Sequence, residues 1–404
     1  MILIETVKDL RAWRKSAGHV IFAPTMGALH EGHTTLVREA RQLAGPEAKV
    51  AASIFVNPLQ FGPNEDFDRY PRTLENDLMM CRGAGADMVF APALKEVYHA
   101  DRSIKISESS LSKVLCGASR PGHFDGVCTV VAKLFNLVQP DEAVFGKKDY
   151  QQLAIIRRLV REARTLAGPE AKVAASIFVN PLQFGPNEDF DKYPRTLEND
   201  LMMCREAGAD MVFAPTMKEV YHADRSIKIS ESSLSTVLCG ASRPGHFDGV
   251  CTVVAKLFNL VQPDEAVFGK KDYQQLAIIR RLVRDLDMPV KIHGIETVRE
   301  SDGLAMSSRN RYLSPAERAQ APALRAALIE AREACQSGVT GTKNLTHLIQ
   351  EYLAAHANLG RMDYIALVDQ HSLQPLDIAH SQSLIALAVF FDKARLIDNI
   401  ELSH

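Results

Sequence analysis

The chain lacks the features that mark several large classes of protein. Its 404 residues contain no apolar run near the length of a membrane span, which is about 18–20 residues. Its formal net charge of −2 leaves no basic excess for nucleic acid or an anionic membrane. Residues 1–16 do not have the layout of a secretory signal. These absences favour a cytoplasmic globular protein, with neither nucleic acid nor a membrane as its partner.

Metal-binding cysteine patterns are also missing. The seven cysteines include no C-x-x-C pair, and six of them are three positions that occur twice. Such spacing is typical of reduced thiols in a reducing compartment. The sequence therefore predicts no structural zinc site.

What the sequence does contain is a large internal repeat. A shift of 123 positions aligns residues 38–160 (copy 1) with residues 161–283 (copy 2), and only six paired positions differ. The tripeptide LVR stands at all three joints. Solenoid repeats are shorter and more numerous, so the pattern indicates a tandem duplication of one block. The flanks 1–35 and 285–404 occur once.

The few differences between the copies bear on which one is used. Copy 1 has Gly83 and Ala93 where copy 2 has Glu206 and Thr216. Each change favours the helices of copy 2 by about 1 kcal/mol. Copy 1, however, is continuous with the predicted strand 19–27 and leaves the ribosome first. These two facts slightly favour copy 1 as the copy that completes the active site. The spare copy would then dock on the main body, pair across a dimer, or be partly disordered.

Predicted strands and helices alternate along most of the chain. Short apolar runs predict buried strands at 19–27, 50–57, 87–92, 142–149 and 288–298. Helices are predicted from about 33 and over 73–86, 126–140 and 150–160. This alternation predicts an α/β fold with a parallel sheet, in which ligands bind at the carboxyl ends of the strands.

A different pattern begins near Leu313. Ser314–Glu317 form a capping box with proline at the first helical position. Two helices and the strand-like segments 362–369 and 383–400 follow. We expect a small C-terminal α+β domain here.

The segment PTMGALHEGH (24–33) lies where a buried strand turns into a helix. His30 and His33 flank a glycine at the helix N-terminus, where backbone N–H groups and the helix dipole favour anions. Two imidazoles there could stabilise charge on phosphate oxygens. The alternative is a pair of surface histidines beside an ordinary turn.

A second segment, FVNPLQFGP, follows a strand in each copy and supplies Gln60 and Gln183. Their amides could hold a small polar substrate, although a plain polar loop is the alternative. Farther along, Asp77 and Asp200 could bind Mg²⁺ near phosphates. They could equally be surface carboxylates of a helix.

Two more candidate site segments follow. FGKKDYQQL occurs in both copies, and the loop DGLAMSSRNRYLS (302–314) occurs once. Lys148 and Lys271 could neutralise phosphates, with a solvated basic turn as the alternative. Arg309 with two neighbouring hydroxyls suits phosphate binding, with a polar linker as the alternative.

These segments, together with ASRPGHFDGV and RLIDNI, occur in the order found in the pantoate–β-alanine ligases, and once the repeat is collapsed the chain resembles that family throughout. The resemblance implies a Rossmann-like nucleotide-binding domain similar to that of class I aminoacyl-tRNA synthetases. It also implies ATP-dependent condensation of pantoate with β-alanine through pantoyl adenylate, with release of AMP and pyrophosphate. ATP with Mg²⁺, a homodimer and a cytoplasmic location are implied as well.

The resemblance also implies roles for particular residues. His33 would be the proton donor and would act with His30. Gln60 and Gln152, or their copies Gln183 and Gln275, would hold pantoate and β-alanine. The ATP site would comprise these histidines and the following residues: Met26, Gly27, Gly146, Lys147, Lys148 and Asp149, or their copies Gly269, Lys270, Lys271 and Asp272, together with Val298, Met306, Ser307, Ser308 and Arg309.

The duplication sets the expected domain boundaries and leaves two other functions open. The nucleotide-binding domain would comprise 1–160 and 284–312, with copy 2 at 161–283 and the C-terminal domain at 313–404. One alternative is another H-x-G-H nucleotidyltransferase. The other is a paralogue whose catalysis the duplication has impaired.

Overall fold

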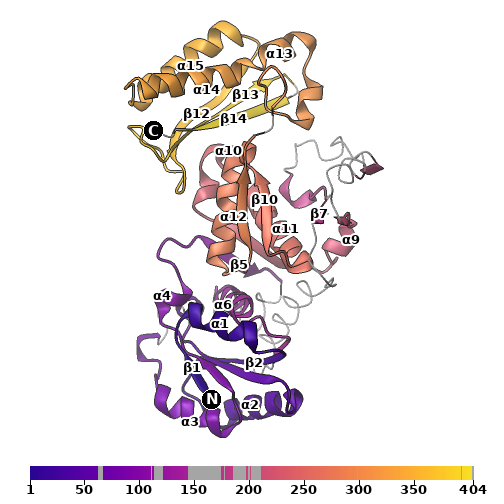
Figure 1. Cartoon of the computed structure of the whole chain (residues 1–404), viewed down its shortest axis with the longest axis vertical. Coiled ribbons are helices and arrows are strands. Elements are labelled where there is room, and N and C mark those ends of the chain that lie inside the picture. Colours follow the sequence, from indigo (N-terminus) through magenta and orange to yellow (C-terminus); the bar gives the residue numbers. More distant parts are fainter. Residues whose placement is uncertain are drawn as a thin grey trace.

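The computed structural model describes residues 1–61, 67–110, 112, 122–143, 174–176, 178–184, 197–198, 201, 211–297, 299–392 and 394–402. These residues form an N-terminal body (1–143), a middle body (174–297) and a C-terminal body (299–402), which follow one another along the long axis (Figure 1). The first two bodies contain the described residues of copy 1 and copy 2, respectively.

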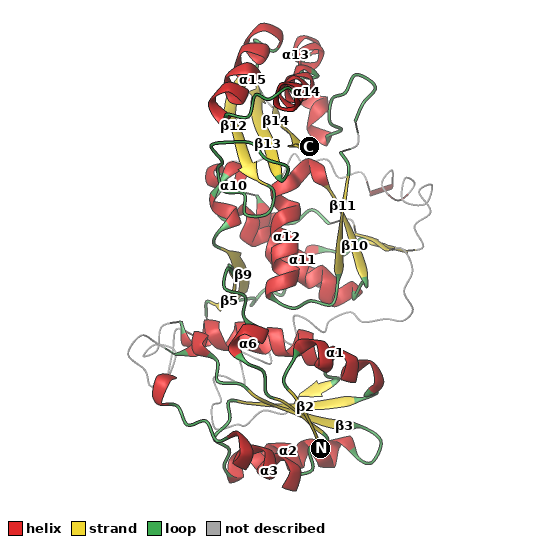
Figure 2. Ribbon diagram, turned by 60° about the vertical axis from the view of Figure 1, so that its left-hand side comes forward, coloured by secondary structure: helices red, strands yellow, loops and turns green. Residues whose placement is uncertain are grey.

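A five-stranded sheet with parallel neighbours forms the centre of the N-terminal body. Its order is β1 (Ile2–Ile4), β4 (Met88–Phe90), β3 (Lys49–Ile54), β2 (Val20–Thr25) and β6 (Glu142–Ala143). Helices α2 (Glu31–Ala44) and α3 (Leu74–Gly83) cover one face, and α1 (Val7–Ser16) and α6 (His123–Val138) cover the other (Figure 2).

Alternation along β2 explains why both faces are covered. Ile21 and Ala23 belong to the cluster that includes α2 and α3, whereas Val20 and Phe22 belong to the cluster that includes α1 and α6. All four side chains are fully buried. A strand buried on both faces is typical of the centre of a parallel sheet.

Four described strands of the middle body form two separate parallel pairs. These are β7 (Ala174–Ser176) with β8 (Met211–Phe213), and β10 (Glu265–Gly269) with β11 (Lys291–Ile295). Its helices are α9 (Met217–Val220), α10 (Leu238–Ser242), α11 (His246–Val261) and α12 (Tyr273–Asp285). Strand β9 (Ile227–Glu231) pairs antiparallel with β5 (Ile104–Glu108) of the N-terminal body, which links the two copies.

The C-terminal body is an antiparallel sheet with helices on one side. Strands β12 (Arg361–Asp369), β13 (Ser383–Phe391) and β14 (Ala394–Leu402) pair in sequence order, and α13 (Pro315–Gln320), α14 (Ala323–Gln336) and α15 (Thr342–His356) accompany them (Figure 1). The predicted capping box is present, since Ser314 Oγ accepts from Glu317 N and Glu317 bonds back to Ser314.

The α/β class with a parallel sheet is confirmed. The strand predicted at 19–27 is β2, and that at 288–298 contains β11. The helix predicted from about 33 begins at Glu31, because His30 caps it. The helix predicted at 150–160 lies outside the described residues. Within the described ranges, no helix has the length and apolarity to cross a membrane.

Candidate active site

The turn between β2 and α2 is shaped by residues with positive φ. Gly27 has φ +85° and Ala28 has φ 51°. A Cβ on Gly27 would lie 3.0 Å from Ile54 Cγ2 and 3.1 Å from Asp77 Oδ2. Glycine is therefore required here both for conformation and for space. The tight turn brings the start of α2 close to the carboxyl end of β2.

His30 and His33 form the N-terminal cap of α2. His30 Nδ1 accepts from Gly32 N at 3.1 Å, and His33 Nδ1 accepts from His30 N at 3.3 Å. The rings lie 4.1 Å apart between centroids. Because each Nδ1 accepts a hydrogen bond, each neutral ring carries its hydrogen on Nε2. Two Nε2–H donors at a helix N-terminus are suited to phosphate oxygens.

Glycine at the centre of H-x-G-H has a specific function. A Cβ on Gly32 would lie 2.9 Å from His30 Cε1, closer than side chains approach one another without rearrangement. The His30 ring can therefore lie over the first turn of α2 only because Gly32 has no side chain.

Asp77 holds this turn in place from α3. Its carboxylate accepts from Leu29 N at 2.8 Å, Ala28 N at 3.0 Å and Thr73 Oγ1 at 3.1 Å, and the residue is 1% exposed. Asp77 is thus neither a surface carboxylate nor directed at solvent. Its role as a Mg²⁺ ligand stays a prediction, and Asp200 lies outside the described residues.

Gln60 lies beside the histidine turn. Its Nε2 donates to Met26 Sδ at 2.6 Å, and its Oε1 accepts from Asn57 Nδ2 at 3.1 Å. Asn57 is held in turn by Tyr98, whose hydroxyl donates to Asn57 Oδ1 at 2.8 Å. The structure therefore brings together Met26, Gln60 and the turn that carries His30, as the sequence predicted for one site.

Close packing of α6 fixes the turn that carries Gln60. A Cβ on Gly126 would lie 2.2 Å from the Leu59 carbonyl oxygen, so the helix can approach only at a glycine. His123 Nδ1 bonds to the Gln60 carbonyl oxygen at 2.7 Å. Copy 2 repeats this arrangement with Gly249, and His246 Nδ1 lies 2.7 Å from the Gln183 carbonyl oxygen. The local geometry around the glutamine is the same in both copies.

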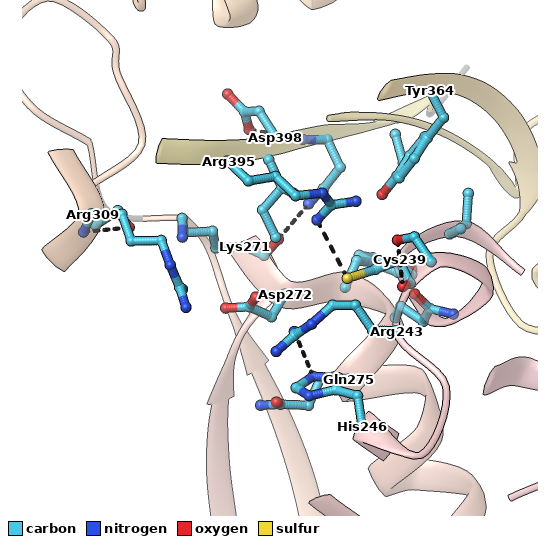
Figure 3. Close-up of a pocket in the computed structure, with 18 of the residues that line it drawn as sticks. Cys239, Arg243, His246, Lys271, Asp272, Gln275, Arg309, Tyr364, Arg395 and Asp398 are labelled. Carbon is cyan, nitrogen blue, oxygen red and sulfur yellow. Dashed lines mark hydrogen bonds between the residues drawn. The ribbon is translucent and has the colours of Figure 1, made fainter. Parts of the chain in front are cut away.

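The second half of the candidate site is a cavity of about 630 Å³ between the middle and C-terminal bodies (Figure 3). Four cationic side chains line it: Arg243, Lys271, Arg309 and Arg395. The lining includes five of the predicted site residues: Lys271, Asp272, Gln275, Ser307 and Arg309. Asp272, Asp392 and Asp398 also line the cavity, so cations outnumber carboxylates by one, and arginine and lysine side chains there are suited to binding phosphate oxygens.

The two lysines of the turn after β10 have different surroundings. Lys270 Nζ is 2.6 Å from Glu296 and 2.7 Å from Glu401. Burial opposes the charge of Lys270, but these two carboxylates outweigh it and raise the Lys270 pKa. Lys270 is therefore in an ion-pair network, and Lys271 lines the cavity. Asn399 fixes this turn, because its Nδ2 donates to the carbonyl oxygens of Lys270 and Lys271.

The loop at 306–309 leads into a short 3-10 helix, Ser308–Tyr312. Ser307 caps it, since its Oγ accepts from Arg309 N at 3.3 Å. Met306 is 52% exposed. Gly269 lies at the end of β10, whereas Val298, Gly146, Lys147, Lys148, Asp149 and Gln152 lie outside the described residues.

Several cavity residues were not nominated from the sequence. Arg243 and His246 come from the ASRPGHFDGV segment, and Arg243 Nη1 lies 3.0 Å from His246 Nε2. Arg395 bonds to Cys239 Sγ at 3.4 Å and to Asp363 at 2.7 Å. The RPGH motif was a usable signal for Arg243 and His246. Arg395 comes from the C-terminal body and is the first residue of the RLIDNI segment, so that segment was a usable signal for it.

The two halves lie in different bodies. His30, His33, Met26 and Gln60 are in the N-terminal body, whereas the cavity with Lys271, Gln275 and Arg309 is at the far end of the middle body (Figures 1 and 3). The single loop 306–309 therefore lies with copy 2, and the single histidine motif lies with copy 1.

Comparison with known proteins identifies the family. The profile of the family described as Pantoate-beta-alanine ligase matches residues 2–168 and again 163–401. The pantothenate synthetase of Akkermansia muciniphila is 54% identical over 249 residues, which cover 61% of this chain and 87% of the relative. That of Clostridium novyi is 50% identical over 228 residues, covering 56% and 80% respectively.

A solved pantothenate synthetase from Thermus thermophilus is 33% identical, with full coverage of both chains and a TM-score of 0.42. The first match covers the N-terminal body, and the second covers the middle and C-terminal bodies, so each match includes one copy of the repeat. The family expected from the order of the motifs is thereby confirmed, and with it the ATP-dependent ligase class. The chain belongs to the pantoate–β-alanine ligase family.

Proposed function

We propose that this chain condenses pantoate with β-alanine at a site assembled from both of its halves. A pantoate carboxylate oxygen attacks the α-phosphorus of ATP, and the bond to pyrophosphate breaks. The β-alanine amine then attacks the acyl carbon of pantoyl adenylate, the bond to AMP breaks, and the amine loses a proton. Pantothenate, AMP and pyrophosphate are the products.

The observation that carries this proposal is a strand that occurs in both halves. Strand β6 pairs with β2 through Ile21–Glu142 and Phe22–Ala143. Strand β10 begins with the same residues, Glu265 and Ala266, and pairs with β11. If β10 takes the place of β6, the two sheets become one parallel sheet in the order β1-β4-β3-β2-β10-β11.

Such a sheet would bring the two halves of the site together. Neighbouring strands are about 4.8 Å apart, so the turns after β2 and β10 would be adjacent at the carboxyl edge. The Nε2–H groups of His30 and His33 would then face the same phosphates as Lys271 and Arg309. Donors fixed before the reaction stabilise charge that develops in the transition state.

The remaining groups fit the smaller substrates and the metal. Gln60 and Gln275 would hold pantoate from two sides, and Gln183 and Gln152 are their copies. Mg²⁺ would enter with ATP and be held mainly by its phosphates. The three hydrogen bonds that Asp77 accepts fit an anchoring role for that carboxylate beside them.

The test is AMP formation from ATP, pantoate and β-alanine. The proposal expects β-alanine-dependent AMP release from the unmutated chain, and it fails if there is none. AMP or pyrophosphate release that ignores β-alanine would instead favour a different H-x-G-H nucleotidyltransferase.

Variants of two residues that occur once test whether the two halves of one site come from the same chain or from two chains. His33→Ala and Arg309→Ala each remove a group that has no second copy, so each variant alone should have strongly reduced activity. Activity that returns when the two variants are mixed would place the halves of one site on two chains. Activity of the unmutated chain without such rescue would place them on one chain. Gln60→Ala and Gln183→Ala, assayed side by side, identify the glutamine that is used.

A catalytically impaired paralogue is the second candidate. It is favoured by the separation of His33 from the cavity that contains Arg309. Failure of AMP formation, with ATP still bound, would support it. A homodimeric assembly and a cytoplasmic location are further parts of the proposal, and they rest on the family alone.

A further inference from the structure

The β5–β9 pair joins two copies of the same five residues, IKISE. Its register places Ile106 opposite Ile229, which are corresponding residues of the two copies. Ile104 lies opposite Glu231, and Glu108 lies opposite Ile227. Exchanging the copies therefore reproduces the same set of pairs. Such self-complementarity is the defining property of an isologous, two-fold interface.

Hydrogen bonds across the pair also occur twice. Ser109 N donates to the Ser226 carbonyl oxygen at 3.0 Å, and Ser232 N donates to that of Ser103 at 3.2 Å. The hydroxyls of Ser109 and Ser232 bond to the same two oxygens at 3.2 and 3.3 Å. Each of these four contacts thus has its counterpart in the other copy.

Two buried glutamates make the pairing specific. Glu108 and Glu231 are 3% and 4% exposed. Ser226 Oγ donates to Glu108, and Ser103 Oγ donates to Glu231. A buried carboxylate is costly unless it is hydrogen-bonded. Each copy therefore supplies a serine hydroxyl that donates a hydrogen bond to the buried carboxylate of the other copy.

The helices behind the strands obey the same symmetry. Ile106 N donates to Thr129 Oγ1 on α6, and Ile229 N donates to Thr252 Oγ1 on α11, both at 3.0 Å. Lys105 pairs with Asp125 at 2.8 Å as Lys228 pairs with Asp248 at 2.7 Å. The symmetric unit is therefore a strand with its supporting helix, not a chance contact between two strands.

We propose that Ser103–Ser109 is a self-recognition edge whose natural partner is another copy of itself, and that this chain satisfies it internally with Ser226–Ser232. A chain with one copy has only one such edge, so its complement must come from a second chain. Here the duplication places both edges on one polypeptide. The segment thus forms a two-fold pseudo-dimer contact within a single chain.

An engineered disulfide in the full chain tests this. Ile106 N bonds to Thr129 and not to β9, so Ile106–Ile229 is a non-hydrogen-bonded pair, with Cα atoms about 4.5 Å apart and within reach of a disulfide. Ile106→Cys and Ile229→Cys are made singly and together, oxidised, and analysed by denaturing, non-reducing electrophoresis. We expect the double variant to lose two thiols while keeping the mass of one chain.

The single variants decide between pairing within and between chains. If copy 1 pairs with copy 1 of another chain, Ile106→Cys alone will form disulfide-linked dimers, and this would overturn the proposal. The matched control is Lys95→Cys with Lys218→Cys, exposed corresponding positions on α4 (Leu94–Val97) and α9. An equal yield of intrachain disulfide from the control would also overturn it.

Hydrogen exchange of the unmutated chain gives a result that does not depend on substitutions. Residues 99–112 and 222–235 have the same sequence, so their peptides coincide in mass. We expect one slowly exchanging envelope, because both edges are paired. A bimodal envelope, with half of the population exchanging fast, would mean that one edge is unpaired and would contradict the proposal.

Discussion

The two copies of the repeat have almost the same sequence but different surroundings. In copy 1, the strand MVF (β4) lies in a five-stranded sheet, and Met88 is 0% exposed. In copy 2, the same strand (β8) pairs with β7 alone among the described strands, and Met211 is 49% exposed. The difference is β1 and β2, which each occur once: β1 pairs with β4, and β2 pairs with β3 of copy 1. Burial of a strand is therefore decided by its neighbours and not by its own residues.

Other parts of the copies are the same in both. Asn57 and Asn180 each accept from a tyrosine hydroxyl at 2.8 Å, from Tyr98 and Tyr221 respectively. Burial raises the pKa of Tyr98 far above its usual range. Both partners of this asparagine–tyrosine hydrogen bond belong to the same copy, so the bond forms without β2 or the rest of the sheet. The copies thus differ where contacts come from outside the repeat, and they agree where contacts come from inside it.

The largest expected effect is on catalysis, at a residue that copy 2 lacks. His33→Ala should lower the rate of AMP formation about 10²–10³-fold, as the loss of a preorganised donor does elsewhere. Steady-state assays with all three substrates measure it. His347→Ala, on the exposed face of α15, is the control and should leave the rate unchanged. A His33→Ala chain with full activity would remove the histidine motif from the mechanism.

Asp77 and its copy Asp200 should differ in their effect on stability. Asp77→Ala removes the acceptor of three hydrogen bonds and leaves two backbone N–H groups of the single 27–29 turn unsatisfied. We expect a loss of about 2–4 kcal/mol in the free energy of unfolding. Asp200→Ala should cost less, because copy 2 has no such turn. Denaturant titration of both variants tests this, and equal losses would contradict the anchoring role.

A third comparison uses the identical methionines of β4 and β8. Met88→Ala should lower the free energy of unfolding by about 2–3 kcal/mol, because the side chain is fully buried. Met211→Ala should change it by no more than about 0.5 kcal/mol. Thermal unfolding of the two variants measures both changes in stability. If Met211→Ala were as costly as Met88→Ala, copy 2 would be packed as copy 1 is.

The smallest effect concerns a helix cap that only copy 2 has. Thr216 and Glu219 form a capping box at the start of α9, whereas Ala93 makes no such bond at α4. Thr216→Ala should cost about 1 kcal/mol, and the reverse change Ala93→Thr should gain up to the same amount. Opposite shifts in denaturant midpoint would support this interpretation. Shifts in the same direction would mean that other contacts dominate.

Much of the local structure followed from the sequence, because its causes are local. The caps at Ser314 and Thr216 could be predicted from residues three positions apart. The apolar run of β2 predicted a buried strand, and the structure buries it on both faces. The grouping of Gln60 with His30 followed from the rule that ligands bind at the carboxyl ends of parallel strands, whereas Met26 came from the family resemblance.

The partners of the repeated segments could not be predicted in this way. Glu142–Ala143 and Glu265–Ala266 are identical, so nothing in them says which one pairs with β2 and which with β11. The antiparallel β5–β9 pair was not predicted, although docking of the spare copy was one expectation. Identical segments compete for the same partner, and long-range packing decides the outcome.

The sequence by itself determined the family, the α/β class and the ATP-dependent ligase class, because motifs and periodicity are properties of short segments. Only the tertiary structure decided that the histidines lie with copy 1 and the Ser307–Arg309 loop with copy 2. The physical reason is that the chain has one central strand, β2, for two sets of neighbouring strands. One set can complete its sheet, and the other must find its contacts elsewhere.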